Sequence, residues 1–158
     1  MNDPRAAREL ASRALVDLAA LTELVGNYRV ADEIFGFLAQ QAAEKSLKAW
    51  LALLGKQYPI THNLGQLLKE LGASGVDISG YRGLGSLNPF AVQFRYESMD
   101  SSEPELDRRE ILRTVSVLVK KVNSVITSEP ESGTLLKESP AGYKVKITKT
   151  KPKPRKKK

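Results

Sequence analysis

The chain has no cysteine and only one histidine, His62, in 158 residues. The absence of cysteine excludes disulfides, cysteine-ligated zinc and thiol nucleophiles. A metal centre would have to be built from carboxylates, and the sequence contains neither an EF-hand loop nor a Glu-x-x-His pair. We therefore predict no bound metal and no cofactor. His62 is then the first residue to consider for acid–base chemistry.

Long apolar runs are also missing. None approaches the roughly 18 residues that a membrane helix needs, and no basic-then-apolar signal segment is visible. Apolar residues make up 41% of the chain and charged residues 27%, which is ordinary for a globular protein. We therefore expect a cytoplasmic protein that makes no membrane contact.

The net charge of +7 is distributed unevenly along the chain. Residues 1–128 carry 15 basic and 15 acidic side chains, whereas residues 129–158 carry 10 basic and 3 acidic ones. This last stretch also contains Pro and Gly breakers and finishes in a Lys/Pro run, which predicts disorder. We expect a helical domain over residues 3–128 and a basic flexible tail over residues 129–158.

The tail has two interpretations, and both stay open. As a polybasic arm it would tether the domain to nucleic acid, and about six phosphate contacts would give a log–log salt slope near −5 on duplex DNA. As a solubilising terminus it would bind nothing. The candidate nucleic-acid contacts are Lys151, Lys153, Arg155, Lys156, Lys157 and Lys158.

Apolar residues at helical spacing dominate residues 3–128. They predict helices over residues 4–25, 28–54, 62–71 and 106–126, with a fourth segment around residues 87–98. Asp3 with Pro4 suits the first N-terminus, and Ser102 with Glu105 forms a capping box for the last helix. The Gly-containing residues 80–85 read as a flexible connector, because no strand precedes them as in a phosphate loop. Five helices with short connections predict an all-α antiparallel bundle.

Three groups of polar residues are candidates for function. In the second helix, Gln41, Lys45 and Lys48 share one face and Glu44 lies close to Gln41, forming either a solvated face or a polar seam for a partner helix or anion. Arg95, next to Tyr96 in an apolar segment, needs an anion, either internal or an external phosphate. The third group is the sequence YPITHNL, residues 58–64, where His62 has a structural or an acid–base role and Thr61 or Asn63 caps the third helix.

Taken together, three blocks resemble the HEPN domain (higher eukaryotes and prokaryotes nucleotide-binding). They are QQAAEKSLKA at residues 40–49, the YPxTHxL turn at residues 58–64, and Arg95-Tyr96. The resemblance covers roughly residues 5–127. It implies a bundle of about five helices that forms a homodimer. It also implies pairing with a small nucleotidyltransferase partner in a toxin–antitoxin or stress module, and binding of a nucleotide or RNA.

Many members of the wider superfamily are metal-independent ribonucleases whose signature is an Arg four to six residues before a His. No Arg stands at those positions before His62, and the nearest basic residue on that side is Lys56. We therefore carry over no catalytic residue, and the resemblance favours a non-catalytic protein over a ribonuclease with a degenerate site at His62. The matching positions are the dimer candidates Gln41 and Glu44 and the nucleotide- or phosphate-binding candidates Lys45, Lys48, His62, Arg95 and Tyr96.

Overall fold

The computed structural model describes residues 3–92, 102 and 105–128, and all regular structure within them is helical. The elements follow in the order α1 (Pro4–Leu24), α2 (Asp32–Leu53), α3 (Leu64–Ala73), the 3₁₀ helix η1 (Ser79–Leu87), α4 (Asn88–Val92) and α5 (Arg108–Ser128). The prediction of an all-α bundle of about five helices is confirmed. The predicted tail, residues 129–158, lies outside the described residues.

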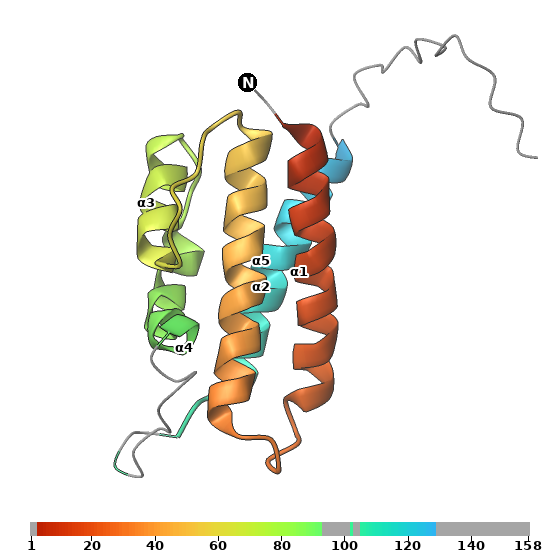
Figure 1. Cartoon of the computed structure of the whole chain (residues 1–158), viewed down its shortest axis with the longest axis vertical. Coiled ribbons are helices and arrows are strands. Elements are labelled where there is room, and N and C mark those ends of the chain that lie inside the picture. Colours follow the sequence, from red (N-terminus) through yellow and green to blue (C-terminus); the bar gives the residue numbers. More distant parts are fainter. Residues whose placement is uncertain (1–2, 93–101, 103–104, 129–158) are drawn as a thin grey trace, which may run out of the picture.

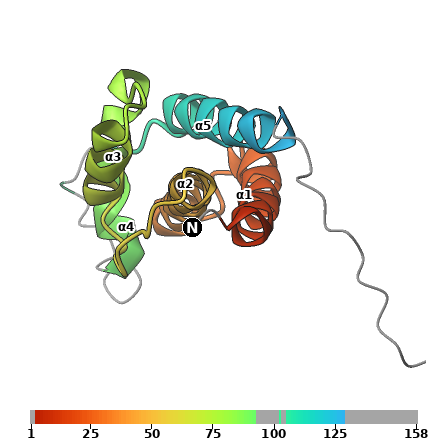
Figure 2. The same cartoon turned by 90° about the horizontal axis from the view of Figure 1, so that it is seen from above.

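Helix α2 is the central element and contacts each of the other helices (Figures 1 and 2). α1 and α5 pack on two of its sides, and α3, η1 and α4 cover a third side. The core is rich in leucine and alanine, and the small alanines let α1 and α2 approach closely. The bulkiest fully buried side chains include Leu21, Phe35, Leu47, Leu51 and Leu118.

The first helix confirms its predicted start and its predicted apolar stripe. Asp3 Oδ1 accepts the Ala6 N–H at 2.9 Å, and Pro4 occupies the first helical position, where it needs no N–H partner. Ala14, Leu18 and Leu21 are buried, and Leu10 and Val25 pack against them.

The second helix begins at Asp32, so the predicted start at Tyr28 was wrong. Asn27 instead organises a turn, because its Oδ1 accepts the Arg29 N–H at 3.2 Å and its carbonyl accepts the Val30 N–H at 3.1 Å. Side-chain bonds of this kind compete with helix formation. The chain therefore bends before α2 starts.

The structure decides between the two predicted caps of the third helix. Asn63 is the N-cap, since its Oδ1 accepts the Gln66 N–H at 3.1 Å, while Thr61 Oγ1 accepts the Asn63 N–H. The stretch that follows was predicted to be a flexible connector, and that was wrong for η1. Leu84 and Leu87 of η1 are buried in the core, which holds this segment in place.

The last helix starts at Arg108, so the predicted capping box of Ser102 and Glu105 was wrong. Asp107 takes that role, because its Oδ1 accepts the Glu110 N–H at 3.0 Å. The predicted stripe is confirmed. Val115, Leu118, Val122 and Ile126 are buried, and Leu106 and Ile111 pack against the core.

A buried arginine, Arg108, ties the start of α5 to the α1–α2 turn. Its side chain is 3% exposed, and its Nε donates to Asp32 Oδ1 at 2.7 Å. Its two Nη groups donate to three backbone carbonyls of the turn, and the guanidinium lies 5.2 Å from the Tyr28 ring centre and 5.1 Å from that of Phe35. The three carbonyls belong to Leu24, Asn27 and Val30. These acceptors explain how a charged group is buried here.

Gly36 marks the closest approach of α4 to α2. A Cβ built on this residue would lie 2.3 Å from Cδ1 of Phe90, far inside van der Waals contact. The residue that looks like a weak point of helix propensity in the sequence is therefore required by packing.

Candidate functional site

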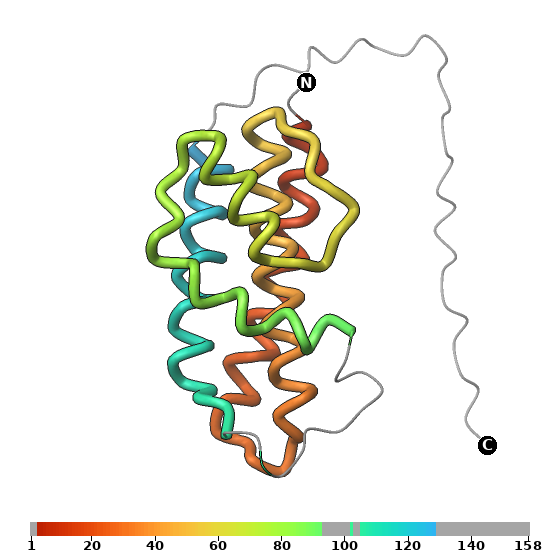
Figure 3. Tube along the Cα trace, turned by 90° about the vertical axis from the view of Figure 1, so that its left-hand side faces the viewer, coloured from red at the N-terminus to blue at the C-terminus, as the bar shows by residue number. Residues whose placement is uncertain are grey.

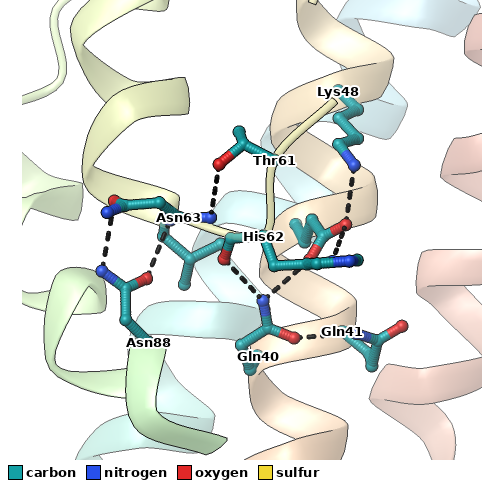
Figure 4. A network of polar contacts seen from close by, with 9 residues as sticks. Gln40, Gln41, Lys48, Thr61, His62, Asn63 and Asn88 are labelled. Atoms are coloured by element: carbon teal, nitrogen blue, oxygen red, sulfur yellow. Dashed lines mark hydrogen bonds and ion pairs between the residues drawn. The ribbon is translucent and has the colours of Figure 1, made fainter. Parts of the chain in front are cut away.

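The polar residues of α2 separate into two sets when the helix is folded. Gln40 and Glu44 are buried, and with Lys48 they repeat at four-residue steps toward the turn at residues 58–63. We call Gln40, Glu44, Lys48 and His62 the Glu44 cluster (Figure 4). The remaining predicted residues, Gln41 and Lys45, belong to the half-exposed side of the helix.

The Glu44 carboxylate is the centre of this cluster. Gln40 Nε2 donates to Oε2 at 2.8 Å, and Lys48 Nζ donates to Oε1 at 2.7 Å. His62 Nδ1 lies 3.2 and 3.1 Å from the two oxygens. Burial raises the pKa of Glu44, but hydrogen bonds from Lys48, Gln40 and His62 outweigh it, so the pKa lies below its usual value. Glu44 is therefore held as a carboxylate at neutral pH.

The turn that carries His62 is fixed from two helices. Gln40 Nε2 also donates to the His62 carbonyl at 3.1 Å, which ties the turn to α2. From α4, Asn88 Oδ1 accepts the Leu64 N–H at 2.8 Å, and its Nδ2 donates to Asn63 Oδ1 at 3.2 Å. Figure 4 shows these bonds on either side of the turn. Asn63 and Asn88 together satisfy open N–H groups of α3, so His62 is not the cap.

The arrangement defines what His62 can do chemically. A carboxylate only accepts hydrogen bonds, so the contact with Glu44 places a proton on Nδ1. In the neutral imidazole this leaves Nε2 as an acceptor, and no described residue bonds to it. The side chain is 64% exposed. His62 is therefore an oriented imidazole open to solvent. Its Nε2 is placed to accept a proton, and in the protonated ring it would donate to an anion.

The two lysines predicted to contact a phosphate both have internal partners. Lys45 Nζ donates to Asp17 Oδ2 on α1, and Lys48 is paired with Glu44 and lies 5.8 Å from the Tyr58 ring centre. Both Lys side chains are mostly buried, at 25% and 15% exposure. An anion at this surface would therefore compete with carboxylates for these cations.

The structure brings some predicted residues together and leaves others unplaced. Glu44, Lys48 and His62 form one cluster, Gln41 donates to Gln40 at 2.8 Å beside it, and Lys45 turns toward α1. Arg95, Tyr96 and the six basic residues of the tail lie outside the described residues, so their assignments stay predictions.

Three residues of the site were missed as site residues in the sequence. Gln40 had a usable signal, because it stands one helical turn before Glu44 on the same face. Asp17 and Asn88 had none, since each reaches its partner only through packing of separate helices.

The described residues lack two features. No group of three or more His, Asp or Glu side chains in residues 3–92 and 105–128 could hold a metal ion. None of the helices in the described part of the chain is long and apolar enough to cross a membrane.

The fold and the site together define an α-helical bundle whose central helix anchors an ordered turn through a buried polar cluster. The HEPN domain family model matches residues 7–125, which includes α2, the turn and the Glu44 cluster. The chain belongs to the HEPN domain family. Comparisons with curated proteins and with solved structures gave no match.

Proposed function

We propose that this HEPN-domain protein is a non-catalytic homodimer that works with a nucleotidyltransferase partner and binds a nucleotide or RNA. The observation that carries the proposal is an open side of the central helix. α2 is packed on three sides, yet no helix of the described residues covers its remaining long side (Figures 1 and 2). We call the side chains on this side the α2 stripe; they are Ile34, Phe37, Leu38, Gln41, Lys45 and Lys48.

The first half of the α2 stripe is suited to contact with protein. Ile34 is 52% exposed, Phe37 and Leu38 are half-buried, and Val92 of the neighbouring α4 is 58% exposed. Apolar side chains that gather on one face of a folded domain are typical of interaction sites. A second copy of the chain covering this half is the homodimer of our proposal.

The second half of the α2 stripe is polar and borders the Glu44 cluster. Lys45 and Lys48 supply nitrogen donors there, and His62 adds one in its protonated form, which supports contact with phosphate groups. Asp17 and Glu44 neutralise much of the lysine charge, so we expect modest affinity that falls with added salt. This pairing also supports a binding role more than a strongly charged catalytic one.

The dimer is tested by sedimentation over micromolar concentrations with one substitution on the α2 stripe. Ile34→Asp should shift the protein from dimer to monomer, because it places a charge in the apolar half. Val117→Asp is the matched control, since Val117 is 51% exposed but lies on α5. A wild-type chain that is monomeric throughout this range, or a dimer unaffected by Ile34→Asp, would refute this face as the dimer interface.

Ligand binding is tested by NMR, which benefits from the single imidazole. The ring signal of His62 should shift and saturate when ATP or a short RNA is added, and Lys45→Met should weaken that response. Lys69→Met on the exposed side of α3 is the control and should leave it unchanged. A His62 signal that does not move with either probe contradicts the binding site.

The partner is tested at the level of genes and then of proteins. A small nucleotidyltransferase gene beside the gene for this chain, whose product copurifies with it, supports the proposal. A nucleotidyltransferase from the same locus that does not bind this chain at micromolar concentration contradicts it.

One observation favours a second candidate, a metal-independent ribonuclease with a degenerate site. A carboxylate bonded to Nδ1 orients an imidazole and stabilises its protonated form during proton transfer, and Glu44 stands in that position relative to His62. This candidate predicts that the protein cleaves RNA in the presence of a chelator and that His62→Ala abolishes cleavage. RNA that stays intact at high protein concentration excludes it.

A further inference from the structure

A groove between α1 and α5 lies away from both the α2 stripe and the Glu44 cluster. Its volume is about 310 Å³. Ala11 and Ile126 are buried at its floor, and Leu15 is 43% exposed on its wall. Arg8 and Ser12 of α1 and Asn123 and Thr127 of α5 line its edges. A second hollow of about 560 Å³ shares Leu15 with the groove and lies farther along α1, over Leu18 and Ala19.

The chain leaves the helical domain at this groove. α1 and α5 run antiparallel, so the end of α5 and the start of α1 lie at the same end of the bundle (Figures 1 and 3). α5 ends at Ser128, directly after the groove-lining Ile126 and Thr127. Any segment that follows Ser128 closely in sequence therefore has this apolar surface within reach.

The sequence after Ser128 contains a pair of large apolar residues at a suitable distance. Leu135 and Leu136 are the first such residues, and the six before them, EPESGT, are small, acidic or turn-forming. Seven residue steps span up to about 23 Å, whereas Ala11 and Ala19 are separated by about 12 Å of helix. The segment is long enough to turn back and lie along the groove.

The charges at this end of the molecule are complementary. Glu129 and Glu131 precede the leucine pair in an otherwise basic tail. Arg8 at the groove and Arg5 one turn earlier are exposed, and no described residue pairs with either. Exposed ion pairs add little affinity, so we expect these charges to set the direction of the segment while the leucines supply the driving force.

We propose that residues 134–137 bind in the α1–α5 groove of their own chain, with Leu135 and Leu136 over Ala11, Leu15 and Ile126. The tail contains a second apolar segment, YKVKIT at residues 143–148. Its apolar residues alternate as in a strand, and the described helical domain offers no sheet edge for it. The bound segment fixes the place from which the basic run at residues 144–158 leaves the domain. That run then departs from the α1–α5 side, away from the α2 stripe.

The absence of cysteine allows a direct test by disulfide trapping in the full-length chain. Ser12→Cys at the groove is combined with Thr134→Cys in the tail, and closure is followed under mild oxidation by mass and gel mobility. Arg13→Cys with Thr134→Cys is the matched control, because residue 13 is the next residue of α1 and does not line the groove. An unbound tail would reach both positions at similar effective concentration.

We expect the intramolecular disulfide of the Ser12 pair to form at least about tenfold faster than that of the Arg13 pair. Adding Leu135→Ser and Leu136→Ser should reduce the Ser12 rate to that of the control. Equal rates for the two pairs, or no effect of the leucine changes, overturn the proposal. A disulfide-linked dimer as the main product also overturns it, because a second copy would then occupy the groove.

Deleting residues 129–158 gives an independent readout that needs no new cysteine. The amide NMR signals of Leu15 and Asn123 should shift on deletion, whereas those of Lys69 on α3 should not. Unchanged signals along the groove contradict the proposal.

Discussion

Replacing Arg108 with alanine removes a buried side chain that bonds the start of α5 to the α1–α2 turn. Its guanidinium is buried against Asp32, whose side chain is 23% exposed, and against three backbone carbonyls. Truncation removes the guanidinium from Asp32, which keeps the Leu106 N–H 3.3 Å from its Oδ2, and it takes one donor from each of the three carbonyls. Breaking a buried ion pair in this way costs about 3–5 kcal/mol. For a domain of this size that corresponds to a fall in Tm on the order of 10–20 °C.

The comparison variants separate charge from geometry. Arg108→Lys keeps the charge but replaces the planar fork with a single donor group, so we expect a smaller loss than for Arg108→Ala. Arg113→Ala is the control on the same helix, because Arg113 is 67% exposed and its one ion pair among the described residues is with Glu110. Its midpoint should match that of the wild type.

The measurement is urea unfolding followed by circular dichroism and by the fluorescence of Trp50, the single tryptophan, which is 6% exposed. Arg108→Lys supplies the result if Arg108→Ala does not fold. A midpoint for either Arg108 variant equal to that of Arg113→Ala would refute the reasoning that the buried guanidinium stabilises this junction.

Three further predictions concern stability. Gly36→Ala should lower the free energy of unfolding by about 1–2 kcal/mol, because the alanine Cβ displaces the Phe90 ring even though alanine has the better helix propensity. Gly85→Ala is the control and should not lower it, since the space around Gly85 is open. Equal urea midpoints for the two variants contradict this prediction. Folding lowers the pKa of Glu44 from 4.5, so the free energy of unfolding lost in Glu44→Gln should be constant above about pH 5.5 and shrink as the pH falls through 4.5 and below. A difference in urea midpoint between wild type and Glu44→Gln that does not vary between pH 7 and 3.5 rules this out. Asn63→Ala should cost about 1 kcal/mol in thermal unfolding, since it removes the cap of α3; an unchanged Tm would show that the cap contributes nothing.

Errors in the predicted elements fall where local side-chain turns or packing against the core override the pattern of the sequence. α1 and the apolar stripe of α5 follow from local periodicity and were predicted well, because each buries one continuous face. The start of α2 and the cap of α5 were wrong, since Asn27 and Asp107 form local turns that compete with the helical pattern. The helical order of η1 comes from Leu84 and Leu87 entering the core, which the glycines at positions 80, 83 and 85 conceal in the sequence.

The candidate site was predicted only in part, because spacing within one helix can be read from the sequence and contacts between separate elements cannot. Glu44 and Lys48 are one turn apart on one helix, so their pairing follows from spacing alone. His62 reaches Glu44 across 18 positions, and Asn88 reaches Leu64 across 24, which no periodicity encodes. Likewise, Lys45 turns toward Asp17 on α1 although its helical position groups it with Lys48.

The sequence by itself determined the helical class, most helix positions, the HEPN resemblance and the absence of cysteine side chains, because these depend on composition and on spacing within one element. Only the tertiary structure decided which polar residues meet. It showed that Arg108 is buried among carbonyls, that Gly36 is required by Phe90, and that His62 is held by Glu44 with Nε2 open to solvent. Each of these depends on groups far apart in the chain that only packing of the helices around α2 brings together.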